Sequence, residues 1–423
     1  MKVGIYTLGC KVNSYESIYV SKLFEDANYT IGDFNDICDI YIINTCTVTN
    51  QSDVKSRKII REAIRRNPEA CIVAMGCFVE SNRDKLPEGI DVVIGNKDKS
   101  KVVELVEKYL EEKVPVNVLS DDLGESFEDM EIKSFGDKTR AFVKIQDGCE
   151  NFCTYCIIPS VRGKCRSKSL ERVISEITDL VNNGYKEIVL TGIHTGHYGF
   201  DLNISFADLL KEIIKISGLY RLRISSIEAT ELNDEVLEII KNSNIICNHL
   251  HIPLQAGSNQ ILKLMNRKYD IDYFINKINE IRNIRPDIAI STDIIVGFPG
   301  ETEEMFKETL DNSKKIGFSK IHVFPYSIRN NTPAAKMKNQ VDGNTKKDRV
   351  KRLMDLSKEL EIEYMNKFID KEVEVLIERN DDGVSIGHTS NYLLVKIPDS
   401  SYNKEEVVDV KLTEIDYPYV IGK

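Results

Sequence analysis

The sequence contains no tryptophan, no low-complexity tract and no internal repeat. No apolar run approaches the ~20 residues that cross a bilayer, and the first residues start a strand without a signal-peptide cleavage site. The net charge of −10 argues against a surface that coats nucleic acid generally, although a local basic patch remains compatible with it. We therefore expect a cytoplasmic globular protein without membrane contact. Its 423 residues predict two or three domains.

Ten cysteines in a reducing compartment indicate metal ligation rather than disulfides. Three of them form a C-x3-C-x2-C pattern: Cys149, Cys153 and Cys156. They lie on the loop that leaves an expected strand at 142–146. Three such thiolates can hold three corners of a 4Fe–4S cluster and leave one iron open to a substrate or cofactor. The alternative, a structural zinc site, usually needs two C-x2-C-type pairs, and here the nearest further thiol, Cys165, stands alone.

Residues 1–112 alternate between apolar strands and amphipathic helices. Strands are expected at 3–6, 40–43, 71–75 and 92–94, and helices at 17–25, 53–66 and 101–112. This alternation predicts an α/β domain with a parallel sheet that is covered by helices on both faces.

Three cysteines of this region each follow an expected strand: Cys10, Cys46 and Cys77. Parallel strands bring their carboxyl ends to one edge, so these thiols should meet there. Cys38 and Cys71 sit at strand beginnings and are expected to pack in the core. Burial is also the alternative for the first three, but three equivalent positions favour a second metal cluster.

Residues 113–138 are acidic and patternless and are expected to form a linker. The region 139–365 then shows six strands, at 142–146, 187–192, 221–226, 249–254, 289–296 and 320–324. Helices separate them, for example at 170–182, 206–216 and 303–316. Six βα units predict a partial (β/α)6 TIM-like barrel with its active site at the carboxyl ends of the strands.

Polar residues at these strand ends are candidates for a cofactor pocket, together with the aromatic residue inside the cysteine motif: Tyr155, Thr191, Gly192, Ser226, Glu228, Gln255 and Asp293. For any single position, loop or capping chemistry is an equal alternative, but together they describe a lined pocket. The six histidines show no metal-binding spacing and are expected to be packing or surface residues. Residues 366–423 predict short strands and a small β-barrel of the OB type.

With these motifs, the chain resembles the methylthiotransferases of the radical S-adenosylmethionine (SAM) superfamily over its whole length. The segment Gly387–Tyr392 matches the pattern of the family's C-terminal TRAM domain. The opening Thr7-Leu8-Gly9-Cys10-Lys11-Val12-Asn13 is most similar to the branch that acts on threonylcarbamoyladenosine in tRNA. Two other branches, acting on isopentenyladenosine in tRNA or on a ribosomal protein, are the alternatives.

The resemblance implies two 4Fe–4S clusters and SAM as cofactors. The cluster on Cys149, Cys153 and Cys156 would chelate SAM and generate a deoxyadenosyl radical, which takes the hydrogen from carbon 2 of the adenine. The cluster on Cys10, Cys46 and Cys77 would carry the sulfur, and a second SAM would supply the methyl group. A flavodoxin or ferredoxin as electron donor, a sulfur source and a monomeric state complete this expectation. A sulfur-carrying or electron-transfer protein and a non-enzymatic RNA-binding zinc protein are the other classes left open.

Two basic stretches are candidates for contact with tRNA. One lies on the helix after Cys46: Lys55, Arg57, Lys58, Arg61, Arg65 and Arg66. The other, 162–168, follows the C-x3-C-x2-C motif, and its Arg162, Lys164 and Arg166 could also face the carboxylate of the substrate. A solvated surface is the alternative for both. The C-terminal region, with 7 basic and 12 acidic residues, is by itself a poor phosphate binder.

Overall fold

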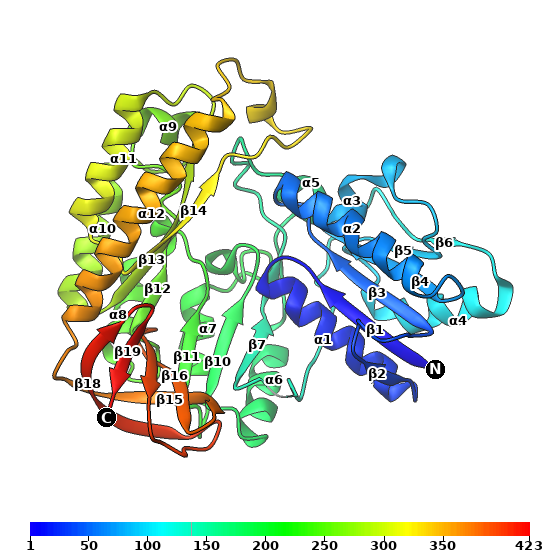
Figure 1. The fold of residues 1–423 in the computed structure, drawn as a ribbon, viewed down its shortest axis with the longest axis horizontal. Helices are drawn as coiled ribbons and strands as arrows, with labels where there is room; N and C mark the ends of the chain where they lie inside the picture. The colour runs from blue at the N-terminus through cyan, green and yellow to red at the C-terminus, as the bar shows by residue number, and fades with distance from the viewer. Residues whose placement is uncertain (137) are drawn as a thin grey trace.

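A computed structural model describes residues 1–136 and 138–423, which form three regions in chain order (Figure 1). An N-terminal α/β sheet is followed by an arch of parallel strands with helices, and the chain ends in a small closed barrel. This arrangement confirms the predicted α/β class and the C-terminal barrel. Among the described residues, no helix is both long and apolar enough to cross a membrane.

The N-terminal sheet has the parallel strand order β2-β1-β3-β4-β5-β6. Its strands are β1 (Lys2–Thr7), β2 (Thr30–Gly32), β3 (Ile40–Thr45), β4 (Cys71–Gly76), β5 (Val92–Ile94) and β6 (Val116–Asn117). Its helices are α1 (Lys11–Asp26), α2 (Asn50–Arg66), α3 (Cys77–Ser81) and α4 (Val102–Glu112). Alternate residues of β3 serve the two faces. Ile40 and Ile42 pack with α1 and α4, whereas Tyr41 and Ile43 pack with α2 and α3.

The segment 113–138 is more ordered than its acidic composition predicts. Strand β6 adds to the sheet beyond residue 112 by pairing with β5. Farther along, Met130, Ile132 and Phe135 are buried in the core of the central region. The expectation of a patternless linker is therefore wrong for these parts, because two-residue strands and single apolar anchors leave no readable periodicity. Asp137, also in this segment, lies outside the described residues.

The central strands are β7 (Arg140–Lys144), β10 (Glu187–Thr191), β11 (Arg221–Ile224), β12 (His249–His251), β13 (Ala289–Val296) and β14 (Lys320–Pro325). Their helices are α6 (Leu170–Asn182), α7 (Phe206–Ile213), α8 (Asp234–Asn242), α9 (Asn259–Leu264), α10 (Ile271–Ile284) and α11 (Glu303–Ile316). Two sets, β7-β10-β11 and β12-β13-β14, are linked by single parallel bridges, Leu222 to Ile246 and Ser226 to His251. No pairing joins β7 to β14 within the described part of the chain, so the barrel is an open arch.

The C-terminal barrel closes in the order β15-β16-β17-β19-β18. Its strands are β15 (Glu372–Asp381), β16 (Val384–Thr389), β17 (Leu394–Ile397), β18 (Val407–Asp416) and β19 (Tyr419–Gly422), and the long helix α12 (Gly343–Asn366) leads into it. Arg221 and Arg223 of β11 donate hydrogen bonds to the carbonyl oxygens of His388 (3.1 Å) and Ser390 (3.2 Å). The barrel therefore sits against the arch on the side where its strands begin, away from the loops at their carboxyl ends.

Candidate functional site

Three cysteines lie at the carboxyl edge of the N-terminal sheet. Cys10 caps α1 after β1, Cys46 follows β3, and Cys77 begins α3 after β4. Since β1, β3 and β4 are neighbours, the sheet brings the three thiols together. A Cβ on Gly9, where φ is 102°, would lie 3.0 Å from the Cys46 Sγ, so the close approach of these two turns requires glycine.

The environment of these thiols is desolvated and carries a nearby positive charge. Desolvation raises the pKa of Cys46 and of Cys10, and the Arg162 guanidinium opposes the rise at Cys10. Metal thiolates form by loss of these protons, so ligation here would release them. Cys38 and Cys71 are buried in the two apolar cores of the sheet, as expected for packing residues.

The second group of thiols lies on the loop after the short strand β8 (Gln146–Asp147), which pairs with β9 (Arg166–Ser167). Cys149 follows Gly148, where φ is 76° and a Cβ would lie 1.8 Å from the Lys164 carbonyl oxygen. The Cys156 amide donates to the Cys153 carbonyl (3.0 Å), which closes a turn. Burial and the two neighbouring thiols raise the pKa of Cys156 to about 12. The loop then enters α5 (Ile158–Arg162).

The two groups of thiols meet at one interface between the N-terminal sheet and the arch. Cys77 packs with Ile157 and Val161, which follow the C-x3-C-x2-C loop. The Asn96 side chain donates to the Val161 carbonyl (2.8 Å) and lies 3.4 Å from the Cys77 Sγ. The chain thus places the end of one cysteine loop directly against a thiol of the other group.

A buried ionic network holds this interface. Arg162, fully buried, pairs with Glu16 of α1 and with Asp147 of β8, both at 3.0 Å, and donates to the Asn13 Oδ1 (2.8 Å). Lys99 and Lys144 also pair with Glu16, at 2.6 Å and 2.9 Å. Although desolvation opposes ionisation, these cations hold the pKa of Glu16 well below its usual value. Among the groups paired at 3.0 Å or less, three cations and two carboxylates leave a surplus of positive charge beside Cys10 and Cys77, and Arg166, 4.0 Å from the Asp147 carboxylate, adds to it.

This network overturns one prediction. Arg162, Arg166 and Lys168 of the basic run are buried, and only Lys164 is exposed. Arg166 donates to the carbonyl oxygens of Leu123 (2.6 Å) and Arg162 (2.8 Å) instead of facing solvent. Arg162, Arg166 and Lys168 are therefore not available to RNA or to a substrate carboxylate, because they compensate carboxylates and carbonyls inside the protein.

Part of the predicted cofactor pocket gathers beside the cysteine loop. Tyr155 is half-buried, and desolvation raises its pKa although Arg267 opposes the rise. Arg267 pairs with Glu228 and lies 3.5 Å from the Cys153 Sγ. A Cβ on Gly192 would lie 3.1 Å from the Gln146 Oε1. Gly192 and the preceding Thr191, the last residue of β10, therefore lie beside β8, which leads into the loop. Sequence reasoning missed Arg267, which lies far along the chain in a segment without a motif.

The other pocket candidates lie on neighbouring strands of the arch. Ser226 is exposed and forms the bridge to His251 that joins the two halves. Gln255 follows β12 with φ of 68°, and its amide donates to the Asp293 carbonyl (2.8 Å). Asp293 is inside β13 rather than at its end, and its carboxylate lies 3.2 Å from the His251 Nε2. Tyr155 is part of the cysteine loop, Glu228 is linked to it through Arg267, and Gly192 lies against Gln146 of β8, just before the loop.

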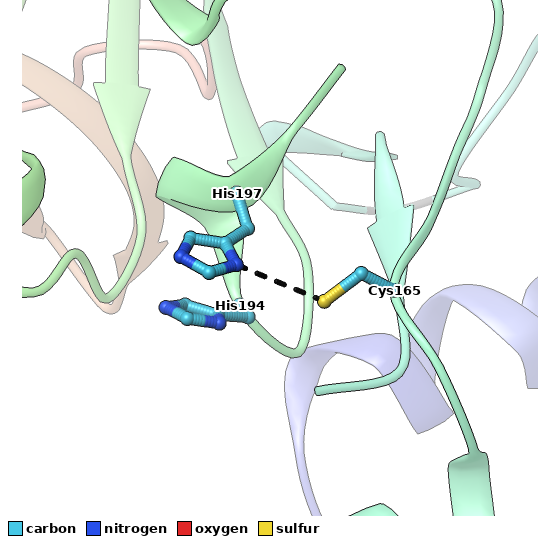
Figure 2. A group of neighbouring side chains, drawn as sticks. All are labelled: Cys165, His194 and His197. Atoms are coloured by element: carbon cyan, nitrogen blue, oxygen red, sulfur yellow. Dashed lines mark hydrogen bonds between the residues drawn. The ribbon is translucent and has the colours of Figure 1, made fainter. Parts of the chain in front are cut away.

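Two histidines also lie at this site, contrary to the expectation of packing or surface roles. His194 Nδ1 is 3.6 Å from the Cys149 Sγ, and His197 Nδ1 is 3.9 Å from the Cys165 Sγ. Figure 2 shows the two imidazole rings stacked beside Cys165. Cys165 is therefore not isolated, since its amide also donates to Glu150 inside the motif (3.2 Å). The only sequence signal was the H-x2-H spacing after β10.

Helix α2 retains four exposed cations of its predicted six: Lys55, Lys58, Arg61 and Arg65. Arg57 lies over the Phe78 ring and Arg66 over the Phe34 ring, so these two are partly used in packing. The helix begins near the carboxyl ends of the arch strands, because Arg329, after β14, pairs with Asp53 (2.9 Å). The first turns of α2 therefore lie near the cysteine loops, whereas its last turn lies near the segment before β3, where Arg66 donates to the Phe34 carbonyl oxygen (2.6 Å).

This fold and this site define a radical SAM enzyme. The model of the Radical SAM superfamily matches residues 143–312, and that of the uncharacterized protein family UPF0004 matches residues 2–95. The solved structure of the radical SAM methyltransferase TsrM from Kitasatospora setae is similar with a TM-score of 0.59 at 15% identity, over 79% of this chain and 76% of that one. That likeness supports the fold.

Curated relatives define the family more closely. The threonylcarbamoyladenosine tRNA methylthiotransferase MtaB of Bacillus subtilis is 45% identical over 100% of this chain and 96% of its own length. The protein of the same name from Aquifex aeolicus is 39% identical over 94% and 96%. A tRNA-2-methylthio-N(6)-dimethylallyladenosine synthase of Acetivibrio thermocellus is 35% identical over 97% and 88%. The chain belongs to the methylthiotransferase family of radical SAM enzymes.

Proposed function

We propose that this enzyme methylthiolates carbon 2 of threonylcarbamoyladenosine beside the anticodon of tRNA, using two 4Fe–4S clusters and SAM. One observation carries the proposal: two groups of three thiols, each without a fourth cysteine in its pattern, meet at one interface between the N-terminal sheet and the arch. One open iron that binds SAM and another that holds sulfur would then face a shared space. A single cluster could not perform both tasks at once.

The ligands follow from the two groups. Cys149, Cys153 and Cys156 would hold the cluster that supplies reducing power to SAM. Cys10, Cys46 and Cys77 would hold the second. The surplus positive charge beside Cys10 and Cys77 fits an anionic thiolate cluster, because an uncompensated buried charge is costly. An electron donor such as flavodoxin or ferredoxin and a sulfur source would complete the system.

The pocket for SAM would be lined by the seven predicted residues: Tyr155, Thr191, Gly192, Ser226, Glu228, Gln255 and Asp293. Glu228 is the best-supported of them, since it pairs with Arg267 beside Cys153. The carboxylate of Glu228 suits an ammonium or hydroxyl donor, and the backbone at Gly192 allows close approach of a ligand.

A threonylcarbamoyl substrate carries a carboxylate, and we propose Lys11 as the cation that meets it. Lys11 is exposed, directly follows Cys10, and has no hydrogen bond or ion pair to any described residue. Surrounding protein and the nearby Arg223 and Arg140 lower its pKa, so an anion there would relieve unfavourable charge. An isopentenyl group would gain nothing from this lysine, since it offers no hydrogen-bond acceptor.

Nucleoside mass spectrometry of tRNA tests the substrate. Deletion of the gene should remove the methylthio group from the threonylcarbamoyl nucleoside alone, and Lys11→Met should reproduce much of that loss while Lys11→Arg retains activity. Loss from the isopentenyl nucleoside, or a change in a ribosomal protein with tRNA intact, would assign the enzyme to another branch.

A further inference from the structure

His194 lies between a cysteine of the radical SAM motif and a buried carboxylate. Its Nδ1 is 3.6 Å from the Cys149 Sγ. Its Nε2 contacts the Glu231 carboxylate and lies 3.4 Å from the side-chain Nδ2 of Asn151. The backbone amide of His194 donates a hydrogen bond to the Gln146 Oε1 (2.7 Å). This bond ties the backbone of His194 to β8, the strand that precedes Cys149. The imidazole is thus held at its backbone and at both ring nitrogens.

Cys165, His194 and His197 could be taken for the ligands of a separate metal ion, because one ligand atom of each lies within 4.8 Å of the others. The two imidazoles, however, are stacked with centroids 3.8 Å apart and planes only 22° from parallel (Figure 2). The lone pair of an imidazole nitrogen lies in the plane of its ring, so stacked rings direct their lone pairs side by side and not toward one point. A mononuclear metal is therefore a poor fit.

An ion pair fits better, in which the His194 Nε2 lies against the Glu231 Oε1. Glu231 is held in place because its Oε2 accepts from the Glu228 amide (3.0 Å) in a capping box. Glu231 also lies 3.5 Å from the His197 Nε2, so it serves both rings. Such a carboxylate–histidine pair is the usual means by which a protein orients a group that contacts a metal ligand.

We propose that His194, oriented by Glu231, is a positioning residue that donates a hydrogen bond to the Cys149 thiolate and thereby raises the reduction potential of the cluster held there. The inference rests on the proposed iron–sulfur site. Reduction adds negative charge to the cluster and its thiolates, and a donated N–H stabilises the more negative state. A residue that is not itself a cluster ligand would thus adjust the reduction potential that is available for SAM cleavage.

The test is an EPR-monitored redox titration of the reconstituted full-length enzyme, in which the radical cluster is identified by the change of its signal on adding SAM. His194→Phe should lower the ratio of reduced to oxidised cluster about tenfold at a fixed potential, which is about 59 mV for one electron. His194→Asn, whose amide can occupy the place of Nδ1, should restore most of the ratio. His197→Phe is the matched control, because His197 faces Cys165, and should leave the potential unchanged.

Iron content measured on each variant separates loss of the cluster from a change in potential. Should His194→Phe fail to load iron, Glu231→Gln decides, and it should shift the potential in the same direction by a smaller amount. A fully loaded His194→Phe enzyme with the wild-type potential, or an equal shift in His197→Phe, would overturn the inference. A wild-type protein without any SAM-responsive cluster would instead refute the proposed function.

Discussion

Glu16 offers the sharpest test of the buried network that joins the two thiol groups. Glu16→Gln keeps the shape of the side chain but removes the carboxylate that pairs with all three of Lys99, Lys144 and Arg162. The closely paired groups then pass from three cations and two carboxylates to three cations and one, so the surplus of buried positive charge grows. By contrast, Arg162→Met leaves two cations and two carboxylates among these groups and lowers the surplus.

The expected magnitudes follow from this difference. Removing one partner of a buried ion pair costs about 3–5 kcal/mol, and Glu16→Gln should fall at the upper end of that range. Arg162→Met should cost less, despite losing its bonds to Asp147 and Asn13. Glu25→Gln on the same helix is the control. Glu25 is exposed and, among the described residues, pairs only with Lys22 (3.7 Å), so a change of at most ~0.5 kcal/mol is expected.

Guanidinium unfolding of the apoprotein, followed by circular dichroism, measures these free energies from the first transition. Since the cations hold the pKa of Glu16 well below its usual value, its contribution is complete at pH 7 and at pH 5 and is lost progressively as the pH falls from its unfolded pKa of ~4.3 toward that lowered pKa. A cost below ~1 kcal/mol for Glu16→Gln, or a larger cost for Arg162→Met, would refute the charge argument.

Three further predictions concern the metal, the RNA and pH. Reconstituted enzyme should bind about eight irons, and replacing either Cys149, Cys153 and Cys156 or Cys10, Cys46 and Cys77 with alanine should leave about half; saturation at four, or stoichiometric zinc, contradicts two clusters. Changing Lys58, Arg61 and Arg65 of α2 to glutamate should weaken tRNA binding and flatten its salt dependence, whereas the same change at Lys307, Lys314 and Lys315 of α11 should do neither; equal effects would return α2 to an ordinary solvated face. His388 and Arg140 hold the pKa of Glu378 at about 2 although desolvation opposes this, so its stabilisation is present above its unfolded pKa of ~4.3 and is lost as the pH falls toward 2; a Glu378→Gln protein with unchanged stability at pH 6 would exclude that contribution.

Much of the fold could be predicted because its elements are periodic and capped. Helices α6 and α11 occupy the predicted residues, and in each the side chain of the preceding residue, Ser169 or Thr302, caps the helix as N-caps do. Strand β12 is shorter than expected, since it ends at His251, two residues before Pro253, which has no amide to donate. Strands β2 and β6, of three and two residues, are too short to show a pattern.

The site was less predictable, because its contacts join distant segments. The C-x3-C-x2-C spacing indicates a cluster locally, and the strand-end positions of Cys10, Cys46 and Cys77 indicate their convergence. Nothing local distinguishes the buried Arg162 from a solvated cation, since its partner Glu16 is 146 residues away in the sequence. His194 and Arg267 were missed for the same reason. Charge and histidine patterns become informative only once topology has brought their partners together.

The open edge of the arch makes the N-terminal sheet a structural necessity for the rest of the chain. Strand β7 has β10 on one side, and α1 packs against it. A fragment that began near residue 139 would leave Lys144 and Arg162 with Asp147 as their only carboxylate partner from the network and would uncover this edge. The boundary that is visible in the sequence near residue 139 is therefore not a place where the protein can be divided. We expect the N-terminal sheet and the arch to fold as one cooperative unit, although each has its own sequence pattern.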